Sequence, residues 1–184
     1  MLSLLTLLLI TFILISGASI VWSTLRLGIS PMPSTRMAQD VMLQLADETG
    51  SGPIYDLGSG WGHLVVRLSK RFPQRKIVGY ELSLLPWLTS VTLKRILRLK
   101  NLTIHRKNFM ANDLSNASVL VCYLYPAAML AIKEKLALEK SNIQYLISQS
   151  FALPAQPVFK KRQLNDFYKS PVYLYRLNTV NTRV

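Results

Sequence analysis

The sequence predicts an α/β fold, in which helices cover both faces of a mainly parallel sheet. Three observations lead to this prediction. Short runs that favour strands alternate along the chain with segments of helical periodicity. One of these runs ends in a glycine-rich turn that leads directly into a helix. The last two runs follow one another as in an antiparallel pair, whereas the earlier alternation is typical of βαβ units.

The elements follow in order from residue 36. Apolar side chains at helical spacing predict a helix over 36–48, and the glycines and proline at 50–53 end it. A strand then leads into the glycine turn, and a helix covers 63–72. The remaining elements continue this pattern, with strands at 76–81, 102–106, 119–125 and 143–150, helices at 87–99 and 127–138, and an antiparallel pair at 158–164 and 172–177.

The first 25 residues are the most apolar part of a chain whose mean hydropathy is +0.25. No charged side chain precedes Arg26. A helix over 4–25 would rise roughly 33 Å, enough to cross a hydrocarbon core of about 30 Å. A cleaved signal peptide is the alternative, but it would begin with a basic region. We therefore expect a transmembrane anchor over 1–25, a linker over 26–35 and a folded domain over 36–184.

The first basic residues, Arg26 and Arg36, follow the apolar segment. Basic residues next to a membrane span tend to lie on the cytoplasmic side. This pattern predicts a single-pass membrane protein with a cytoplasmic domain. The N-terminal helix would bind the membrane.

Cysteine and histidine content limits the chemistry of the domain. Cys122 is the only cysteine, so no disulfide can form within the chain. His63 and His105 lie far apart and have no ligand at metal-binding spacing. We therefore expect no metal site.

The chain of 184 residues carries a formal net charge of +13. Such a charge suits nucleic acid, an anionic lipid surface or simply solvated helix faces. No RNA-binding motif is visible, and no aromatic residues are interleaved with the basic ones. Nucleic acid is therefore the less favoured partner, and an anionic lipid surface explains the charge more simply.

The glycine turn carries the clearest chemical signal. Asp56 ends a strand, and glycines follow at alternate positions, Gly58, Gly60 and Gly62. Glycine lets the backbone approach a ligand closely, and the next helix directs its free N–H groups to the same place. The spacing differs from the dinucleotide fingerprint, which would need glycine where His63 stands. An acid before the turn suits a cationic ammonium, which indicates S-adenosylmethionine; a turn that only permits close packing is the alternative.

A second acid, Glu81, ends the next predicted strand. A carboxylate at that strand end can accept hydrogen bonds from both hydroxyls of a ribose. Together, Asp56 and Glu81 favour a nucleoside-type cofactor over a purely structural turn.

With these motifs, residues 31–177 resemble the class I S-adenosylmethionine-dependent methyltransferases. The resemblance implies a Rossmann-like seven-stranded fold and S-adenosylmethionine as cofactor. Glu81 matches the ribose-binding acid of that family, and Asn108 and Phe109 follow the third strand where the family contacts the adenine. Asp113 is the alternative to Asn108. The first motif of the family matches Asp56, Gly58, Ser59, Gly60 and Gly62.

More narrowly, the chain resembles the small membrane-anchored lysine methyltransferases related to the mitochondrial ATP synthase c-subunit and adenine nucleotide translocase enzymes. Three features carry this likeness: the apolar N-terminus, the proline-rich segment 31–35, and Leu124-Tyr125-Pro126 after the fourth strand. It implies methylation of a lysine in a protein at or in the membrane. Tyr125, or Tyr123 on the same face, would orient the amine, although both tyrosines could simply pack under helices.

Other functions remain open on the sequence alone. The same domain could methylate RNA, lipid or a small molecule, or it could be a membrane-tethered module that binds a nucleoside without turnover.

Overall fold

The computed structural model describes residues 3–11, 17, 34–138 and 142–177. Its centre is a seven-stranded sheet with the order β3-β2-β1-β4-β5-β7-β6. Strands β1 to β5 are mutually parallel, and β7 runs antiparallel to both β5 and β6. The strands are β1 (Ile54–Leu57), β2 (Ile77–Tyr80), β3 (Leu102–His105), β4 (Val119–Cys122), β5 (Tyr145–Gln149), β6 (Lys160–Gln163) and β7 (Pro171–Arg176).

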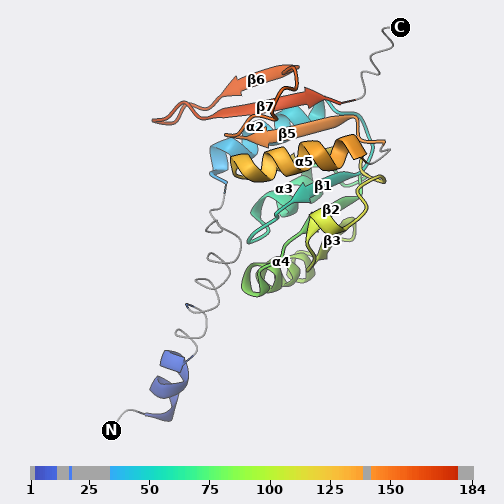
Figure 1. The fold of residues 1–184 in the computed structure, drawn as a ribbon. Helices are drawn as coiled ribbons and strands as arrows, with labels where there is room; N and C mark the ends of the chain where they lie inside the picture. The colour runs from blue at the N-terminus through green and yellow to red at the C-terminus, as the bar shows by residue number, and fades with distance from the viewer. Residues whose placement is uncertain (1–2, 12–16, 18–33, 139–141, 178–184) are drawn as a thin grey trace, which may run out of the picture.

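Helices lie on both faces of this sheet (Figure 1). One face packs against α2 (Arg36–Asp47), α3 (His63–Arg71) and α4 (Leu84–Ile96). The other face is covered by α5 (Pro126–Leu138) and by the short 3₁₀-helix η1 (Phe109–Ala111). The two apolar layers are formed by alternate strand residues, which point to opposite faces. The predicted Rossmann-like fold with a mainly parallel seven-stranded sheet is confirmed.

Local chemistry explains where the helices begin. The Thr35 side chain accepts a hydrogen bond from the Ala38 N–H and caps α2. Pro86 lies in the first turn of α4, and Pro126 is the first residue of α5. Proline is tolerated there because the first N–H groups of a helix have no partner within the helix.

The order of the strands reverses beside β1, which pairs with β2 on one side and with β4 on the other. At such a point the loops that follow neighbouring parallel strands leave in opposite directions and open a crevice beyond their carboxyl ends. The glycine turn follows β1, Glu81 follows β2, and Tyr123 follows β4. The fold therefore brings the predicted site residues to one edge of the sheet.

At the opposite, amino-terminal edge of the parallel strands, polar side chains hold the loops together. Asn101 donates from its side-chain nitrogen to the carbonyl oxygens of Ser69, Phe72 and Arg75 at 3.0–3.1 Å. Its carbonyl oxygen accepts a hydrogen bond from the Ser69 hydroxyl. This network fixes the end of α3 against the start of β3.

The structure corrects the prediction for the N-terminal segment. In the ranges that the structure describes, no helix is long and apolar enough to cross a membrane. Residues 12–16 and 18–33, which make up most of the expected anchor and linker, lie outside the described residues. This finding contradicts the predicted single-pass membrane localisation, which was wrong on this evidence.

Candidate active site

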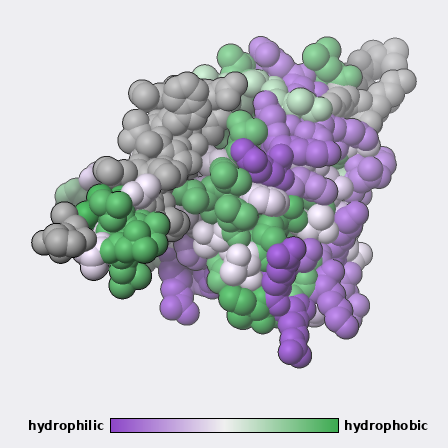
Figure 2. Space-filling view, turned by 90° about the horizontal axis from the view of Figure 1, so that it is seen from below, coloured by the Kyte–Doolittle hydropathy of each residue, from purple (hydrophilic) through white to green (hydrophobic). Residues whose placement is uncertain are grey.

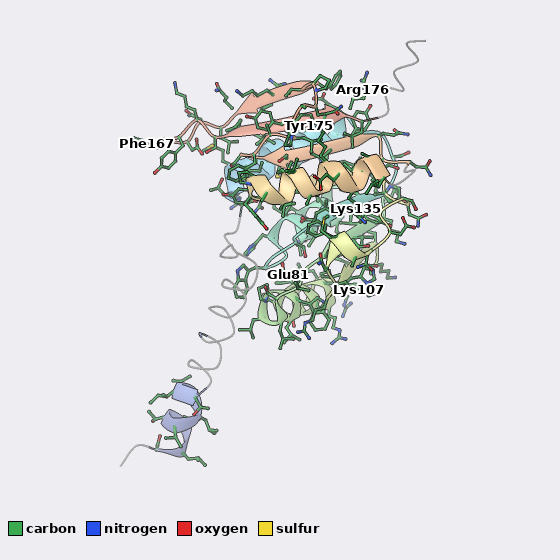
Figure 3. The ribbon with its side chains drawn as sticks, viewed as in Figure 1. Glu81, Lys107, Lys135, Phe167, Tyr175 and Arg176 are labelled. Atoms are coloured by element: carbon green, nitrogen blue, oxygen red, sulfur yellow. The ribbon has the colours of Figure 1, made fainter. Side chains whose placement is uncertain are left out.

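A cavity of about 530 Å³ opens at the carboxyl edge of the strands, beside β1, β2 and β4. Figure 3 shows Glu81 and Lys107 from its lining in the lower half of the domain. Most of the predicted site residues line it: Asp56, Gly58, Ser59, Gly60, Glu81, Asn108, Phe109, Tyr123 and Tyr125. The fold thus gathers side chains from four separate loops around one space.

The backbone of the glycine turn follows the wall of the cavity. Gly58 and Gly60 have positive φ values of 106° and 53°, which L residues with side chains rarely adopt. A Cβ atom on Gly60 would meet no heavy atom within 4 Å, so this residue borders open space in the cavity. Gly60 therefore leaves room for a ligand against the backbone.

Gly62 serves a different purpose in the same turn. It is not among the residues that line the cavity. A Cβ atom at this position would lie 2.6 Å from the Ser90 hydroxyl oxygen, and φ is 86°. Gly62 therefore permits close packing of the start of α3 against α4, which is the alternative that the sequence left open for this turn.

The Glu81 carboxylate closes the turn from the β2 side. One oxygen accepts a hydrogen bond from the Gly60 N–H at 2.8 Å, and the other from the Ser83 N–H at 2.7 Å. Each oxygen keeps further lone pairs for a ligand, since a carboxylate offers about four acceptor sites. Glu81 is thus oriented by the backbone on both sides and faces the cavity.

Asp56 is a buried acid in the site, and its pKa is strongly raised. It is only 3% exposed, and within the described part of the chain no group donates a hydrogen bond to its side chain. Burial and the nearby negative charge of Glu81 raise the pKa of Asp56 to about 8. A buried carboxylate without a donor or a counter-charge is costly. A cationic ligand would supply what the protein does not.

The Ser59 side chain lies against Gly79 of β2, where a Cβ atom would be 3.0 Å from the Ser59 hydroxyl oxygen. Its hydroxyl oxygen is buried, and among the described residues it has no hydrogen-bond partner. S-adenosylmethionine carries a cationic ammonium, two ribose hydroxyls and a sulfonium. The unpaired Asp56 carboxylate, the free acceptor sites of Glu81 and the open space beside Gly60 fit these groups.

The adenine end of the predicted site lies after β3. The Asn108 side chain accepts a hydrogen bond from the Met110 N–H at 3.0 Å and caps η1. Asp113, the alternative to Asn108, is exposed and accepts hydrogen bonds from the Ser115 N–H and hydroxyl, both at 2.8 Å. Only Asn108 of this pair lines the cavity.

The two tyrosines lie in a loop and not on a strand, because β4 ends at Cys122. Tyr123 stacks with Phe151, with ring centroids 6.4 Å apart and an interplanar angle of 16°. Tyr125 is 36% exposed, and both tyrosines line the cavity. Sequence alternation therefore no longer relates the two side chains, and Tyr125 is the more accessible.

Several lining residues escaped the sequence analysis, namely Ser34, Gln39, Trp61, His63, Lys107 and Phe151. Trp61 and Phe151 had a detectable signal, because one lies inside the glycine turn and the other follows the carboxyl end of a predicted strand. Gln39 had none: it stands on the buried face of α2, where its side chain accepts a hydrogen bond from Arg67.

Known proteins are similar to this chain over the region that contains most of these residues. A family model described as the ANTKMT methyltransferase domain matches residues 56–159. The RNA methyltransferase of Salinibacter ruber, solved with S-adenosyl-L-homocysteine, has a TM-score of 0.70 and 22% identity, covering 79% of this chain and 93% of that chain. M. capricolum TrmK, solved with the same cofactor product, has a TM-score of 0.61 and 13% identity, covering 80% and 70%. Among curated proteins no match is found.

The matched region contains Asp56, the glycine turn, Glu81 and both tyrosines. The cofactor is S-adenosylmethionine, and the protein is a class I methyltransferase. Because the family model spans more than half of the sequence, the chain belongs to the ANTKMT methyltransferase domain family.

Proposed function

We propose that the protein transfers the methyl group of S-adenosylmethionine to the side-chain amine of a lysine in a protein substrate. The observation that carries this proposal is the match of the ANTKMT methyltransferase domain across the whole site. The character of the cavity supports it. Among the described lining residues the only carboxylates are Asp56 and Glu81, and the remaining wall is largely aromatic or aliphatic.

We assign the cofactor contacts as follows. Asp56 holds the ammonium group, and Glu81 accepts hydrogen bonds from the ribose hydroxyls. The backbone at Gly58–Gly60 lies against the methionine part and the ribose. Asn108 and Phe109 contact the adenine. When bound, S-adenosylmethionine supplies an electrophilic methyl group on a positively charged sulfur.

The acceptor amine must reach the cavity in its neutral form, because only the neutral amine has a free lone pair. We assign to Tyr125 or Tyr123, which both line the cavity, the role of accepting a hydrogen bond from this amine and orienting it, with Tyr125 preferred because it is more accessible. The rings of Tyr123 and Phe151 stack in the cavity wall, and we assign to them the role of limiting the access of water. Placement and exclusion of water are the main contributions a protein makes to such a displacement.

RNA is the second candidate substrate. The net charge of +13 favours binding to a polyanion, and the structurally similar protein from Salinibacter ruber is an RNA methyltransferase. Against RNA, two of the three Lys and Arg side chains of α3 pair with acids of α2: Arg67 with Asp40, and Arg71 with Asp47.

Methyl transfer from labelled cofactor tests the proposal. The purified protein is incubated with methyl-labelled S-adenosylmethionine and a cell extract, and the product is treated separately with protease and ribonuclease. We expect label that protease releases and that amino-acid analysis identifies as methyllysine. Label released by ribonuclease would favour the second candidate.

A matched pair of variants controls for contaminating enzymes. Asp56→Asn should abolish the labelling, whereas Asp113→Asn should leave it unchanged, because Asp113 does not line the cavity. Labelling that survives in Asp56→Asn would come from another protein.

A further inference from the structure

Helix α4 exposes aliphatic side chains along its outer side. Of its 13 residues only Pro86 and Ser90 are fully buried. The Trp87 indole turns inward and donates a hydrogen bond to the Ile104 carbonyl oxygen of β3 at 3.4 Å. On the outer side, aliphatic side chains recur at intervals of four and eight residues and are 39–70% exposed: Leu84, Leu88 and Ile96. The helix therefore presents an aliphatic surface that no described part of the chain covers.

Cations lie near both ends of this helix. Residues 82–112, which include α4, β3 and η1, contain no Asp or Glu. The basic residues of this segment are Lys94, Arg95, Arg98, Lys100, Arg106 and Lys107. The first four lie at the end of α4 or just beyond it, and the last two follow β3 at the carboxyl edge, where α4 begins. None of the six forms an ion pair with another described residue.

The cations also gather around β3 in space. Burial lowers the pKa of His105, the last residue of β3, and the positive charges of Lys107, Lys76 and Lys94 lower it further. Lys76 directly precedes β2, so cations from three separate segments act on one imidazole. The charge of this surface is therefore not spread evenly along the chain but concentrated at the α4–β3 edge of the sheet.

The two acids that flank this segment in the sequence are engaged elsewhere. Glu81 is 8% exposed, lines the cavity and accepts hydrogen bonds from two backbone N–H groups. Hydrogen bonds from Ser115 lower the pKa of Asp113, and the positive charge of Lys135 on α5 lowers it further. Neither acid therefore balances the cations at the end of α4.

Other helices of the domain differ from α4 in this respect. Helix α5 exposes Leu130 and Leu138, but it carries Glu134 between two lysines. Two cations of α3 pair with acids of α2, and the aliphatic side chains of α3 are buried. Of the helices α2 to α5, only α4 combines exposed aliphatic side chains with cations and no acid. Helix α4 lies at the lower end of the domain in Figure 1, and Figure 2, seen from below, shows a hydrophobic area on this face with hydrophilic side chains beside it.

We propose that α4 and the cations near its ends form a docking surface for an anionic lipid bilayer. A helix that lies in the plane of the headgroups buries its apolar side at the acyl boundary, while its cations meet anionic headgroups. Such contact needs no helix that spans the bilayer. Because Leu82 and Ser83, directly before α4, line the cavity, docking through α4 places the mouth of the cavity beside the lipid surface.

The composition of the surface favours lipid over two other partners. A second copy of the chain would bring like charges together. Single-stranded RNA is bound by stacking of its bases on aromatic side chains, and Trp87, the aromatic residue of α4, turns inward. The aliphatic side chains need an apolar partner and the cations need an anionic one. An anionic bilayer supplies both.

Sedimentation with phospholipid vesicles tests the inference. The whole 184-residue chain is mixed with vesicles of phosphatidylcholine, or of phosphatidylcholine with phosphatidylglycerol. We expect about 10-fold tighter binding to the anionic vesicles. The first 25 residues carry no charged side chain, so binding through them would not distinguish the two vesicles. Equal binding to both would overturn the proposal.

Two double variants locate the binding on α4. Arg95→Gln with Lys100→Gln removes two exposed cations and should weaken binding to the anionic vesicles about 10-fold. Leu88→Ser with Ile96→Ser removes two exposed aliphatic side chains and should also weaken it about 10-fold. The affinity of both variants for S-adenosylhomocysteine should be unchanged, which shows that the domain is folded.

Each variant has a matched control. Lys161→Gln with Arg162→Gln removes the same charge from β6, at the opposite edge of the sheet from β3. Leu130→Ser with Leu138→Ser removes exposed aliphatic side chains from α5, on the other face of the sheet. Neither control should change binding by more than about 2-fold. Equal losses in the α4 variants and their controls would overturn the proposal.

A fluorescent label reports which helix enters the bilayer. Cys122 is the only cysteine and is buried, so a maleimide dye reacts with a cysteine introduced at the surface. With the label in Leu88→Cys, we expect the emission of an environment-sensitive dye to shift to the blue when anionic vesicles are added. The label in Leu130→Cys should show no shift. A shift in Leu130→Cys without one in Leu88→Cys would overturn the proposal.

The same variants decide between lipid and the other partners. Binding of a single-stranded RNA oligonucleotide that falls in Arg95→Gln with Lys100→Gln, with vesicle binding unchanged, would assign the surface to nucleic acid. Dimers that dissociate in Leu88→Ser with Ile96→Ser, with vesicle binding unchanged, would assign it to a second copy of the chain. Either result would overturn the proposal.

Discussion

Asn101, at the amino edge of the parallel strands, and Asp56, at the carboxyl edge, differ in how their polar side chains are paired. At the amino edge, Asn101 uses both side-chain atoms to bind three carbonyls and a hydroxyl. At the carboxyl edge, Asp56 is buried, and no group in the described part of the chain donates a hydrogen bond to its carboxylate. Unpaired buried atoms are not confined to this edge, because the Arg75 Nη2 atom at the amino edge is also buried without a partner among the described residues. Satisfied groups stabilise a fold, and unsatisfied ones cost stability unless a ligand pairs with them. The comparison therefore separates Asn101, which holds the fold, from Asp56, whose carboxylate is left for a ligand.

The largest effect is expected from Asp56→Asn. Removing one partner of a buried ionic contact costs about 4 kcal/mol, so the affinity for S-adenosylmethionine should fall by about three orders of magnitude. Isothermal titration calorimetry measures the change, with Asp113→Asn as the control. An unchanged Kd would show that Asp56 does not contact the cofactor.

The same variant should be more stable than the unmodified protein when no ligand is bound. The pKa of Asp56 is about 8 in the fold, against an ordinary value of 3.8, so the unmodified protein loses stability as the pH rises from about 4 to about 8. Asparagine carries no proton to lose, and this decline should be absent. Urea unfolding at pH 5 and pH 8 compares the two proteins.

Two glycine substitutions test whether Gly62 serves packing and Gly60 serves cofactor binding. Gly62→Ala places a Cβ atom against Ser90 at a positive φ, and we expect a loss of about 3 kcal/mol in the free energy of unfolding. Gly60→Ala meets no protein atom and should cost about 1 kcal/mol, yet it should weaken cofactor binding. A larger loss of stability in Gly60→Ala, together with a loss of cofactor affinity only in Gly62→Ala, would contradict these roles.

Asn101→Ala tests the amino edge. Loss of its hydrogen bonds leaves three carbonyl oxygens without their donor and should lower the free energy of unfolding by about 2 kcal/mol. Cofactor affinity should not change, because Asn101 lies outside the cavity lining. Asn116→Ala, an exposed asparagine, is the control for both measurements. A loss of cofactor affinity in Asn101→Ala would show that the amino edge of the strands influences binding at the carboxyl edge.

Glu81 holds two backbone N–H groups of the fold and also faces the cavity. Glu81→Gln should have the smallest effect of these variants on cofactor binding and stability. Glutamine can still accept a hydrogen bond from Gly60 or Ser83, but not from both with the same geometry. We expect about 10-fold weaker cofactor binding together with a loss of about 1 kcal/mol in stability. Binding that weakens without any loss of stability would show that the two backbone contacts contribute nothing to the fold.

The sequence was sufficient for the parts of the site that depend on neighbouring residues. Asp56, the glycine turn and Glu81 each end or follow a strand, so their edge of the sheet could be predicted from strand order alone. The separate roles of Gly60 and Gly62 could not, because they depend on Ser90 in another helix. The end of β4 at Cys122 was also missed, since the apolar run continues to Leu124. Gln39 reaches the cavity only through packing of α2 against the rest of the domain.

The central claim is that Asp56 is protonated in the free protein and ionises when the cationic cofactor binds. Calorimetric titration with S-adenosylhomocysteine, which keeps the ammonium group, counts the protons exchanged when it is repeated at pH 7 in buffers of different ionisation enthalpy. With the pKa of Asp56 at about 8, binding should release close to one proton in the unmodified protein and none in Asp56→Asn. Binding of normal affinity without proton release in the unmodified protein would contradict the account.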